Sequence, residues 1–159
     1  MFDRRTVVKA AVGLLIALEA VMLMPYKDGA GVWTDGVGNT HNVVPGVPIT
    51  REKAMADLDK NIQTYMVGVE KSLTKPTTNN QLLAYTSFAY NIGVHGFRTS
   101  STAKAHNAAH YMDACLYMLR WTKITVNGKK VESKGLWNRR YKEYNYCISG
   151  VPNVRWTKV

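Results

Sequence analysis

The sequence predicts an α+β fold, with a small antiparallel sheet near the N-terminus and a larger helical region after it. The first observation is the segment 26–44, which holds four glycines, Gly29, Gly31, Gly36 and Gly38. This density suits tight turns between short strands and is costly inside a helix. The second observation is that apolar residues recur about every 3.6 positions on both sides of this segment, as in amphipathic helices.

The length of 159 residues is typical of one domain. We therefore expect a single domain over residues 1–159. Its β lobe is expected at about 25–49, and its helical lobe at about 73–150 together with the N-terminal helix.

Residues 4–24 are predicted to form the first helix. One face of a 3.6-residue repeat is apolar, and its members are Val7, Ala11, Leu14, Leu15 and Leu18. Pro25 is expected to end this helix, because proline lacks the backbone N–H that the next turn needs.

The same N-terminal run has features of a targeting segment, since Arg4 and Arg5 precede it. However, Lys9 leaves only nine uncharged residues before Glu19. A bilayer span needs about 20 apolar residues. No small-residue cleavage site follows, so a buried amphipathic helix is the preferred interpretation.

The remaining elements follow from periodicity, glycines and prolines. Thr50 is a good N-cap for a helix that runs to about Ser72. Further helices are expected at 79–92, at about 101–106 after a connection at 96–101, at 110–121 and at 135–147. Asn127-Gly128 is a type I′ turn signal between short β-type runs, so 122–134 is predicted to be a hairpin. The tail to Val159 is expected to be irregular.

The chain carries a net charge of +10, with 21 Lys and Arg against 11 Asp and Glu. This excess indicates a polyanionic partner, which could be nucleic acid, anionic lipid or a bacterial envelope rich in phosphate and carboxylate. Solubility alone is the other interpretation, and charge does not choose among them. Disorder is excluded because apolar residues, 46% of the chain, recur along its whole length.

The cysteines and histidines give weaker signals. Cys115 and Cys147 are too few for a disulfide scaffold and lack metal-type spacing, so they either pair with each other or are two small buried groups. His106 and His110 have i, i+4 spacing but lack the intervening glutamate of a zinc protease. No metal or cofactor is therefore expected.

Two carboxylates flank the start of the glycine-rich segment. Glu19 ends an apolar run, where partial burial would favour its protonated form, whereas Asp28 lies in a polar Lys/Gly turn that favours the ionised form. Such contrasting environments suit a general acid and a charged partner on either side of a glycosidic bond. An isolated pair at this spacing is nevertheless more often solvated surface.

Additional residues give the pair a specific pattern. Eight residues separate Glu19 from Asp28, five separate Asp28 from Thr34, and a Gly-x-Gly-x-Thr turn ends at Thr40. Downstream, in order, come the segments 90–93, 96–100, 119–121 and 135–140. Together they resemble phage-type lysozymes, the endolysins of glycoside hydrolase family 24, over roughly residues 8–150. The Gly-Val-Trp-Thr segment is closest to the branch that includes signal-arrest-release endolysins.

The resemblance implies a lysozyme-like fold whose two lobes enclose a cleft for peptidoglycan. It implies hydrolysis of the β-1,4 bond between N-acetylmuramic acid and N-acetylglucosamine, causing host cell lysis. Glu19 would be the general acid. Asp28 and Thr34 would hold the attacking water and give inversion, which predicts carboxyl groups about 6.5–9.5 Å apart.

Four further residues are candidates for substrate binding, and two of them, Tyr90 and Asn91, match family positions on the cleft wall. Tyr90 and Asn91 suit stacking and amide contacts with N-acetylated sugars, although Tyr90 also fits a core position. Thr40 and Ser100 are weaker candidates. Trp121 and Trp137 are expected to be core residues.

A basic patch is formed by Lys129, Lys130 and Lys134 on the predicted hairpin. It either contacts an anionic envelope or is a solvated turn, and the second interpretation is slightly favoured.

The chain departs from the family pattern in four places. Ala20 replaces the usual Gly, Asp35 replaces an apolar residue, and Asn39 replaces a common His. Asp35 could act as a third carboxylate near the cleft. The fourth departure is that only 18 residues precede Glu19, which points to release through a holin-type lesion rather than self-export.

The implied setting is synthesis in the host cytoplasm and action in the periplasm and cell wall, by a monomer with no stable membrane span and no nucleic-acid partner. The family packs together the helices that carry Cys115 and Cys147, so a disulfide between them is plausible. Three alternatives stay open: a lytic transglycosylase, an inactive wall-binding homologue, and a basic nucleic-acid binder suggested by charge alone.

Overall fold

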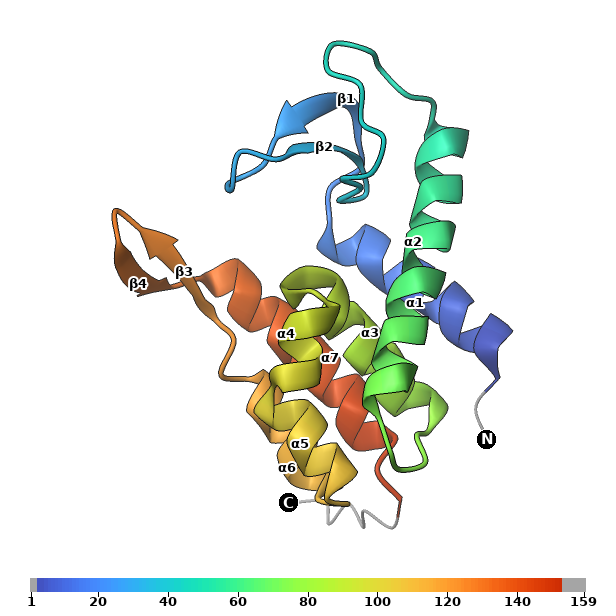
Figure 1. The fold of residues 1–159 in the computed structure, drawn as a ribbon, viewed down its shortest axis with the longest axis vertical. Helices are drawn as coiled ribbons and strands as arrows, with labels where there is room; N and C mark the ends of the chain where they lie inside the picture. Colours follow the sequence, from blue (N-terminus) through green and yellow to red (C-terminus); the bar gives the residue numbers. More distant parts are fainter. Residues whose placement is uncertain (1–2, 153–159) are drawn as a thin grey trace. The chain divides into compact units, whose positions relative to one another are not determined.

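The computed structural model describes residues 3–152, in which seven α-helices and four β-strands confirm the expected α+β class (Figure 1). These residues form two compact units, one of residues 8–64 and the other of residues 3–7 with 65–152. The division falls inside α1 (Arg4–Leu18) and inside α2 (Arg51–Ser72). Most of the tail predicted to be irregular lies outside the described residues.

The first unit contains a two-stranded antiparallel sheet of β1 (Met22–Lys27) and β2 (Trp33–Gly36). The predicted helix over 4–24 is therefore too long, because α1 ends at Leu18 and residues 22–27 pair with β2 instead. Pro25 lies inside β1 at a break in the register between Met22 and Tyr26. A proline without an N–H is tolerated at such a bulge, so it does not end a helix here.

The predicted apolar face of the first helix is buried except at Leu18, which is half-buried. In α1 the buried side chains are Val7, Val8, Ala11, Leu14 and Leu15. In α2 they are Ala54, Leu58, Ile62, Met66 and Val69, while Thr50 caps the helix by accepting a hydrogen bond from the Lys53 N–H at 3.1 Å. Within the described residues, no helix is both long enough and apolar enough for a membrane span.

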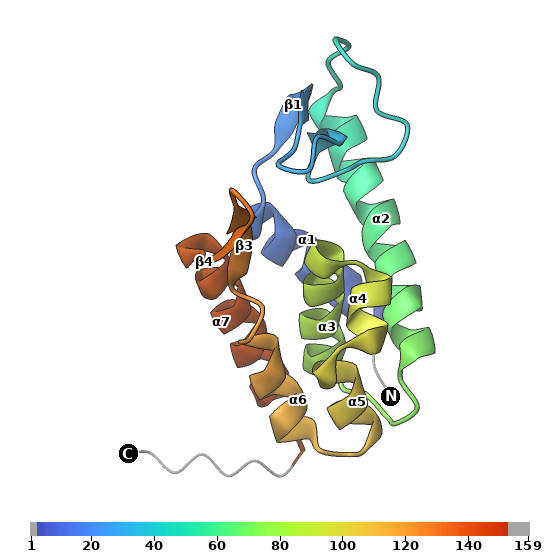
Figure 2. The same ribbon diagram turned by 60° about the vertical axis from the view of Figure 1, so that its left-hand side comes forward.

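The second unit is a helical bundle arranged around α3 (Asn79–Ile92), with α7 (Lys134–Ser149) packed along it (Figure 2). Residues 81–89 of α3 are all buried, and Thr78 opens the helix with a capping box. The other helices are α4 (Val94–Thr99), α5 (Ser101–Asn107) and α6 (Tyr111–Met118). The predicted connection at 96–101 is thus largely helical, since Phe97 is fully buried and anchors a short extra helix.

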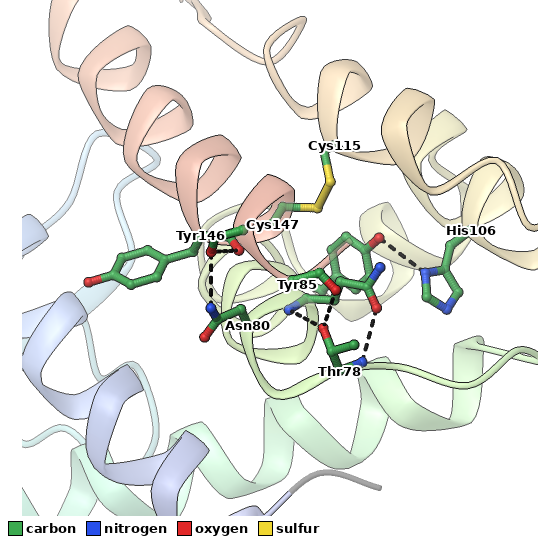
Figure 3. Close-up of a disulfide and its surroundings, with 10 residues drawn as sticks. Thr78, Asn80, Tyr85, His106, Cys115, Tyr146 and Cys147 are labelled. Atoms are coloured by element: carbon green, nitrogen blue, oxygen red, sulfur yellow. Dashed lines mark hydrogen bonds between the residues drawn. A yellow bond between two sulfur atoms is a disulfide. The ribbon is translucent and has the colours of Figure 1, made fainter. Parts of the chain in front are cut away.

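A disulfide joins Cys115 of α6 to Cys147 of α7, with a Cα–Cα distance of 5.6 Å (Figure 3). The pairing suggested by the family resemblance is present. Close by on α3 and α5, the Tyr85 hydroxyl lies 3.1 Å from Nδ1 of His106, and both residues are fully buried.

The predicted hairpin is present as β3 (Lys123–Val126) and β4 (Lys129–Glu132). Asn127 and Gly128 both have positive φ, as a type I′ turn requires. All eight strand residues are exposed. The assignment of Trp121 and Trp137 to the core is wrong, because they are 41% and 51% exposed.

Candidate active site

Glu19 follows α1 directly. Its backbone N–H donates to the Leu15 carbonyl at 2.7 Å, which continues the helical hydrogen-bond pattern by one residue beyond Leu18. The side chain is half-buried. This backbone bond fixes where the helix presents the carboxylate.

Asp28 is held by the turn between β1 and β2. Its Oδ1 accepts hydrogen bonds from the backbone N–H groups of Ala30 and Val32, each at 2.9 Å. The turn closes through Asp28 N–H to Val32 O at 2.9 Å, and Gly31 adopts the positive φ of 78° that the turn needs. One carboxylate oxygen is therefore used by the backbone, while Oδ2 has no partner among residues 3–152.

Thr34 lies directly across the strand pair from Tyr26 and is 3% exposed. Directly opposed residues project on the same face of a sheet, so the two side chains are neighbours. Partial burial raises the pKa of the Tyr26 phenol, and the nearby carboxylates of Glu19 and Asp28 raise it further. Both carboxylates therefore lie close enough to the Tyr26 phenol to raise its pKa, and Thr34 is the residue directly across the strand pair from Tyr26.

Asp35 is not a free third carboxylate. It is 1% exposed, its backbone exchanges two 2.9 Å hydrogen bonds with Asn39, and its Oδ1 accepts from the Asn39 amide at 2.8 Å. Asn39 also accepts from the amide of Asn61 on α2 at 3.0 Å. The two residues that depart from the family pattern, Asp35 and Asn39, thus bond to each other. The bond from Asn61 to Asn39 joins the glycine turn to α2.

Two of the weaker candidates differ in exposure. Thr40 is exposed after the turn. Ser100 is 4% exposed and is the N-cap of α5: its hydroxyl donates to Phe97 O at 2.6 Å and accepts from Ala103 N–H at 3.1 Å. The Ser100 hydroxyl therefore donates and accepts its hydrogen bonds within the helical unit.

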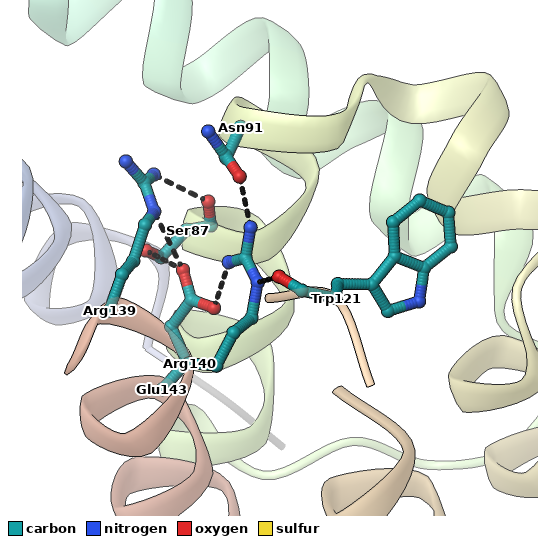
Figure 4. Close-up of polar contacts among 6 residues, drawn as sticks. All are labelled: Ser87, Asn91, Trp121, Arg139, Arg140 and Glu143. Atoms are coloured by element: carbon teal, nitrogen blue, oxygen red, sulfur yellow. Dashed lines mark hydrogen bonds and ion pairs between the residues drawn. The ribbon is translucent and has the colours of Figure 1, made fainter. Parts of the chain in front are cut away.

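Tyr90 and Asn91 end α3 in the other unit. The Tyr90 ring lies 4.9 Å from that of Tyr65. Asn91 is exposed, and its Oδ1 accepts a hydrogen bond from Arg140, whereas its Nδ2 has no partner within the described residues (Figure 4). Because Arg140 can only donate, it orients the Asn91 amide with the N–H₂ group outward.

Arg140 belongs to a buried ionic cluster that the sequence interpretation missed (Figure 4). Glu143 is fully buried and accepts from Arg139 Nε at 3.1 Å, Arg140 Nη1 at 2.5 Å and Ser87 Oγ at 2.7 Å. Arg140 also donates to the Trp121 carbonyl at 3.0 Å. The signal available in the sequence was the i, i+3 and i, i+4 spacing of these charges on one helix.

Metal-ligating side chains do not gather in the part of the chain that the structure describes: no group of three or more His, Cys, Asp or Glu there could hold an ion. The first unit offers two carboxylates, a hydroxyl and a phenol, and the helical unit separately offers the outward amide of Asn91.

These features together define a lysozyme-type glycosidase. The sequence profile of the phage lysozyme family matches residues 17–143, and the chain belongs to this family. It is a muramidase, a glycoside hydrolase.

Individual proteins agree with this assignment. The chain is 37% identical over 130 residues to the endolysin of Acyrthosiphon pisum secondary endosymbiont phage 1, covering 82% of this chain and 89% of that protein. It is 36% identical over 146 residues to the SAR-endolysin of Pseudomonas phage phiKMV, covering 91% and 90%. The solved endolysin from Escherichia coli O157:H7 phage FAHEc1 superposes with a TM-score of 0.81 at 34% identity, covering 90% of this chain and 93% of that one.

Proposed function

We propose that this protein is an endolysin that hydrolyses the β-1,4 bond between N-acetylmuramic acid and N-acetylglucosamine in bacterial peptidoglycan and thereby lyses the host cell. One observation carries the proposal. The carboxylates of Glu19 and Asp28 both contribute to the raised pKa of the Tyr26 phenol, and Thr34 lies directly across the strand pair from Tyr26. An inverting glycosidase needs this set: one group to protonate the leaving oxygen, and others to hold a water.

Glu19 is the proposed general acid. It is half-buried at the end of a helix whose last backbone hydrogen bond fixes its position. Protonation of the leaving oxygen by a positioned carboxylic acid contributes about 10²–10⁴ in rate.

Asp28 and Thr34 are the proposed holders of the attacking water. The backbone N–H groups of Ala30 and Val32 fix Oδ1 of Asp28 and stabilise the ionised form through hydrogen bonding. Oδ2 then keeps its capacity to accept a hydrogen bond. The Thr34 hydroxyl donates to Val32 O at 3.0 Å, so its oxygen lone pairs can accept from the same water.

Tyr90 and Asn91 are the proposed sugar contacts in the helical unit. The outward N–H₂ of Asn91 suits an acceptor such as the carbonyl of an N-acetyl group. Thr40 is exposed and able to add a hydroxyl contact, while Ser100 would act indirectly by holding α4 and α5 in place.

The proposed site of action is the periplasmic cell wall, reached through a holin-type lesion. The apolar face of α1 supports this route, because the fold itself buries it in residues such as Ala11 and Leu15. Spontaneous membrane association of the chain expressed alone would contradict it. The proposed active form is a monomer.

The test compares wild type with Glu19→Gln, using Glu52→Gln on the exposed first turn of α2 as the matched control. Glu19→Gln is expected to lower the rate of wall clearing by about 10²–10⁴, at an unchanged melting temperature, and Glu52→Gln to leave both unchanged. Unchanged lysis by Glu19→Gln would revive the inactive wall-binding alternative.

Mass spectrometry of the released muropeptides separates the enzymatic alternatives. Hydrolysis adds one water to each new end. A 1,6-anhydro product would instead identify a lytic transglycosylase and refute the water-holding role of Asp28 and Thr34. A DNA-shift assay in parallel tests whether the protein is a basic nucleic-acid binder, and no shift is expected.

A further inference from the structure

A hollow of about 780 Å³ lies between the base of the β3–β4 hairpin and the N-terminal part of α7. Its walls include Thr122, Glu132, Lys134, Trp137 and Asn138. None of the residues proposed above for catalysis or sugar contact lines it. Its volume is within the range of about 300–1,000 Å³ that is usual for small-molecule sites.

Trp137 is the aromatic wall of this hollow and is the first ring of a column on α7. Its ring is stacked on that of Tyr141, with centroids 5.2 Å apart and planes 13° apart, and Tyr141 is stacked in turn on Tyr144 at 6.3 Å. Tyr141 covers one face of the indole. Trp137 is 51% exposed and lines the hollow, so part of the indole is accessible from it.

The polar groups in the hollow have capacity for a ligand. The Asn138 amide and the Lys134 ammonium have no hydrogen-bond or ion-pair partner within residues 3–152, and both side chains are exposed. A flat apolar ring beside an unpaired amide and a cation is the combination that binds a pyranose ring. The ring covers the apolar face of the sugar, and the polar groups meet its hydroxyl, amide or acidic substituents.

The hairpin segment beside the hollow carries an excess of positive charge. The segment 122–134 carries Lys123, Lys129, Lys130 and Lys134 against the single acidic residue Glu132. Glu132 is itself paired with Lys123 at 3.9 Å. The local excess of positive charge therefore attracts an anionic saccharide.

We propose that the Trp137 hollow is a second saccharide site, which binds an acidic, N-acetylated stretch of wall glycan apart from the bond being cut. The proposal rests on the wall being the substrate. A lipid surface is disfavoured because the faces of Tyr141 and Trp137 cover each other and because polar groups line the hollow. The site would hold the enzyme on insoluble wall between cleavage events.

The test uses the full-length chain carrying Glu19→Gln and measures binding to purified sacculi. Adding Trp137→Ala is expected to weaken binding about five- to tenfold, as the loss of one aromatic platform would. Tyr146→Ala is the matched control, because Tyr146 is an exposed aromatic residue of α7 outside the column, and it should leave binding unchanged. Asn138→Ala, which leaves the ring stack intact, should weaken binding severalfold.

With Glu19 intact, Trp137→Ala should cleave short soluble muropeptide oligomers at the wild-type rate. Unchanged sacculus binding by both Trp137→Ala and Asn138→Ala overturns the proposal. An equal loss on short oligomers also overturns it, because Trp137 would then belong to the reaction cleft. Loss of binding to phosphatidylglycerol vesicles rather than to sacculi would make the hollow a membrane contact instead. A Glu19→Gln enzyme that still lyses cells would refute the proposed function without affecting this binding test.

Discussion

The turn that presents Asp28 and the cluster around Glu143 hold their charges in opposite ways. Asp28 is half-exposed, and its partners are backbone N–H groups two and four residues away. Glu143 is fully buried, and its partners are side chains from α3 and α7 that lie as far as 56 residues away in the sequence. One charge is placed by local backbone geometry and the other by tertiary packing.

This difference indicates which mutations should change activity and which should change stability. A group placed by its own turn can be changed with little effect on the rest of the fold, and it keeps an outward atom for chemistry. Removal of a buried charge that contacts several charged partners is strongly destabilising. Mutations in the two regions should therefore change different measured quantities.

The largest stability effect is expected from Glu143→Gln. It removes the buried carboxylate that Arg139 and Arg140 both contact, which should lower the free energy of unfolding by about 3–5 kcal/mol. The matched control is Glu132→Gln in the exposed pair with Lys123, where a change below about 1 kcal/mol is expected. Urea unfolding measures both, and similar effects of the two substitutions would remove the contrast between buried and exposed charges.

Removal of the disulfide should lower the free energy of unfolding slightly less than Glu143→Gln does. The Cys115–Cys147 bond closes a loop with a sequence separation of 32 residues, for which loop entropy predicts about 3–4 kcal/mol. The Cys115→Ala/Cys147→Ala double variant should lose this stability and keep its kcat, since neither residue is among those proposed to act on substrate. Urea denaturation with and without reductant provides the check, because reductant should lower the stability of wild type only. If reductant also lowered the stability of the double variant, the disulfide would not be the source of the reductant effect.

Asn91 bonds to Arg140 of the buried cluster and is also a proposed sugar contact. The substitution Asn91→Asp tests whether its amide N–H₂ group donates to the sugar. The new carboxylate still accepts from Arg140, so stability should be unchanged or raised, but the outward atom becomes an acceptor instead of a donor. KM should rise by up to about tenfold, the value of one hydrogen bond. A wild-type KM in a stable Asn91→Asp enzyme would exclude the donor role.

The smallest effect is the pH dependence that comes from His106. Burial lowers the pKa of His106, so the folded state prefers the neutral ring. Stability should then be complete above the unfolded pKa of about 6.5 and fall as pH drops toward the folded pKa, by at most about 1.4 kcal/mol per pH unit.

His106→Gln should flatten this slope between about pH 5 and pH 7, and His110→Gln, on an exposed residue, should not. An unchanged slope in His106→Gln would assign the pH dependence to another group.

The sequence predicted the elements that local chemistry determines. Asn127-Gly128 and Thr50 were placed correctly because turn and cap preferences act over a few residues. The end of α1 was not, because residues 22–24 have helical propensity and strand pairing with β2 overrides it. For the same reason the Glu143 cluster and the exposure of Trp137 could not be predicted, since both depend on which helices pack together.

The central claim is that Asp28 and Thr34 deliver water to the face of the sugar opposite Glu19. Proton NMR of the muropeptide ends, recorded immediately after cleavage, tests it most directly. The account predicts that the reducing end appears first as the α-anomer, inverted from the β-1,4 bond, and then mutarotates. A β-anomer as the first product would mean retention, with a carboxylate acting as nucleophile, and would contradict the account.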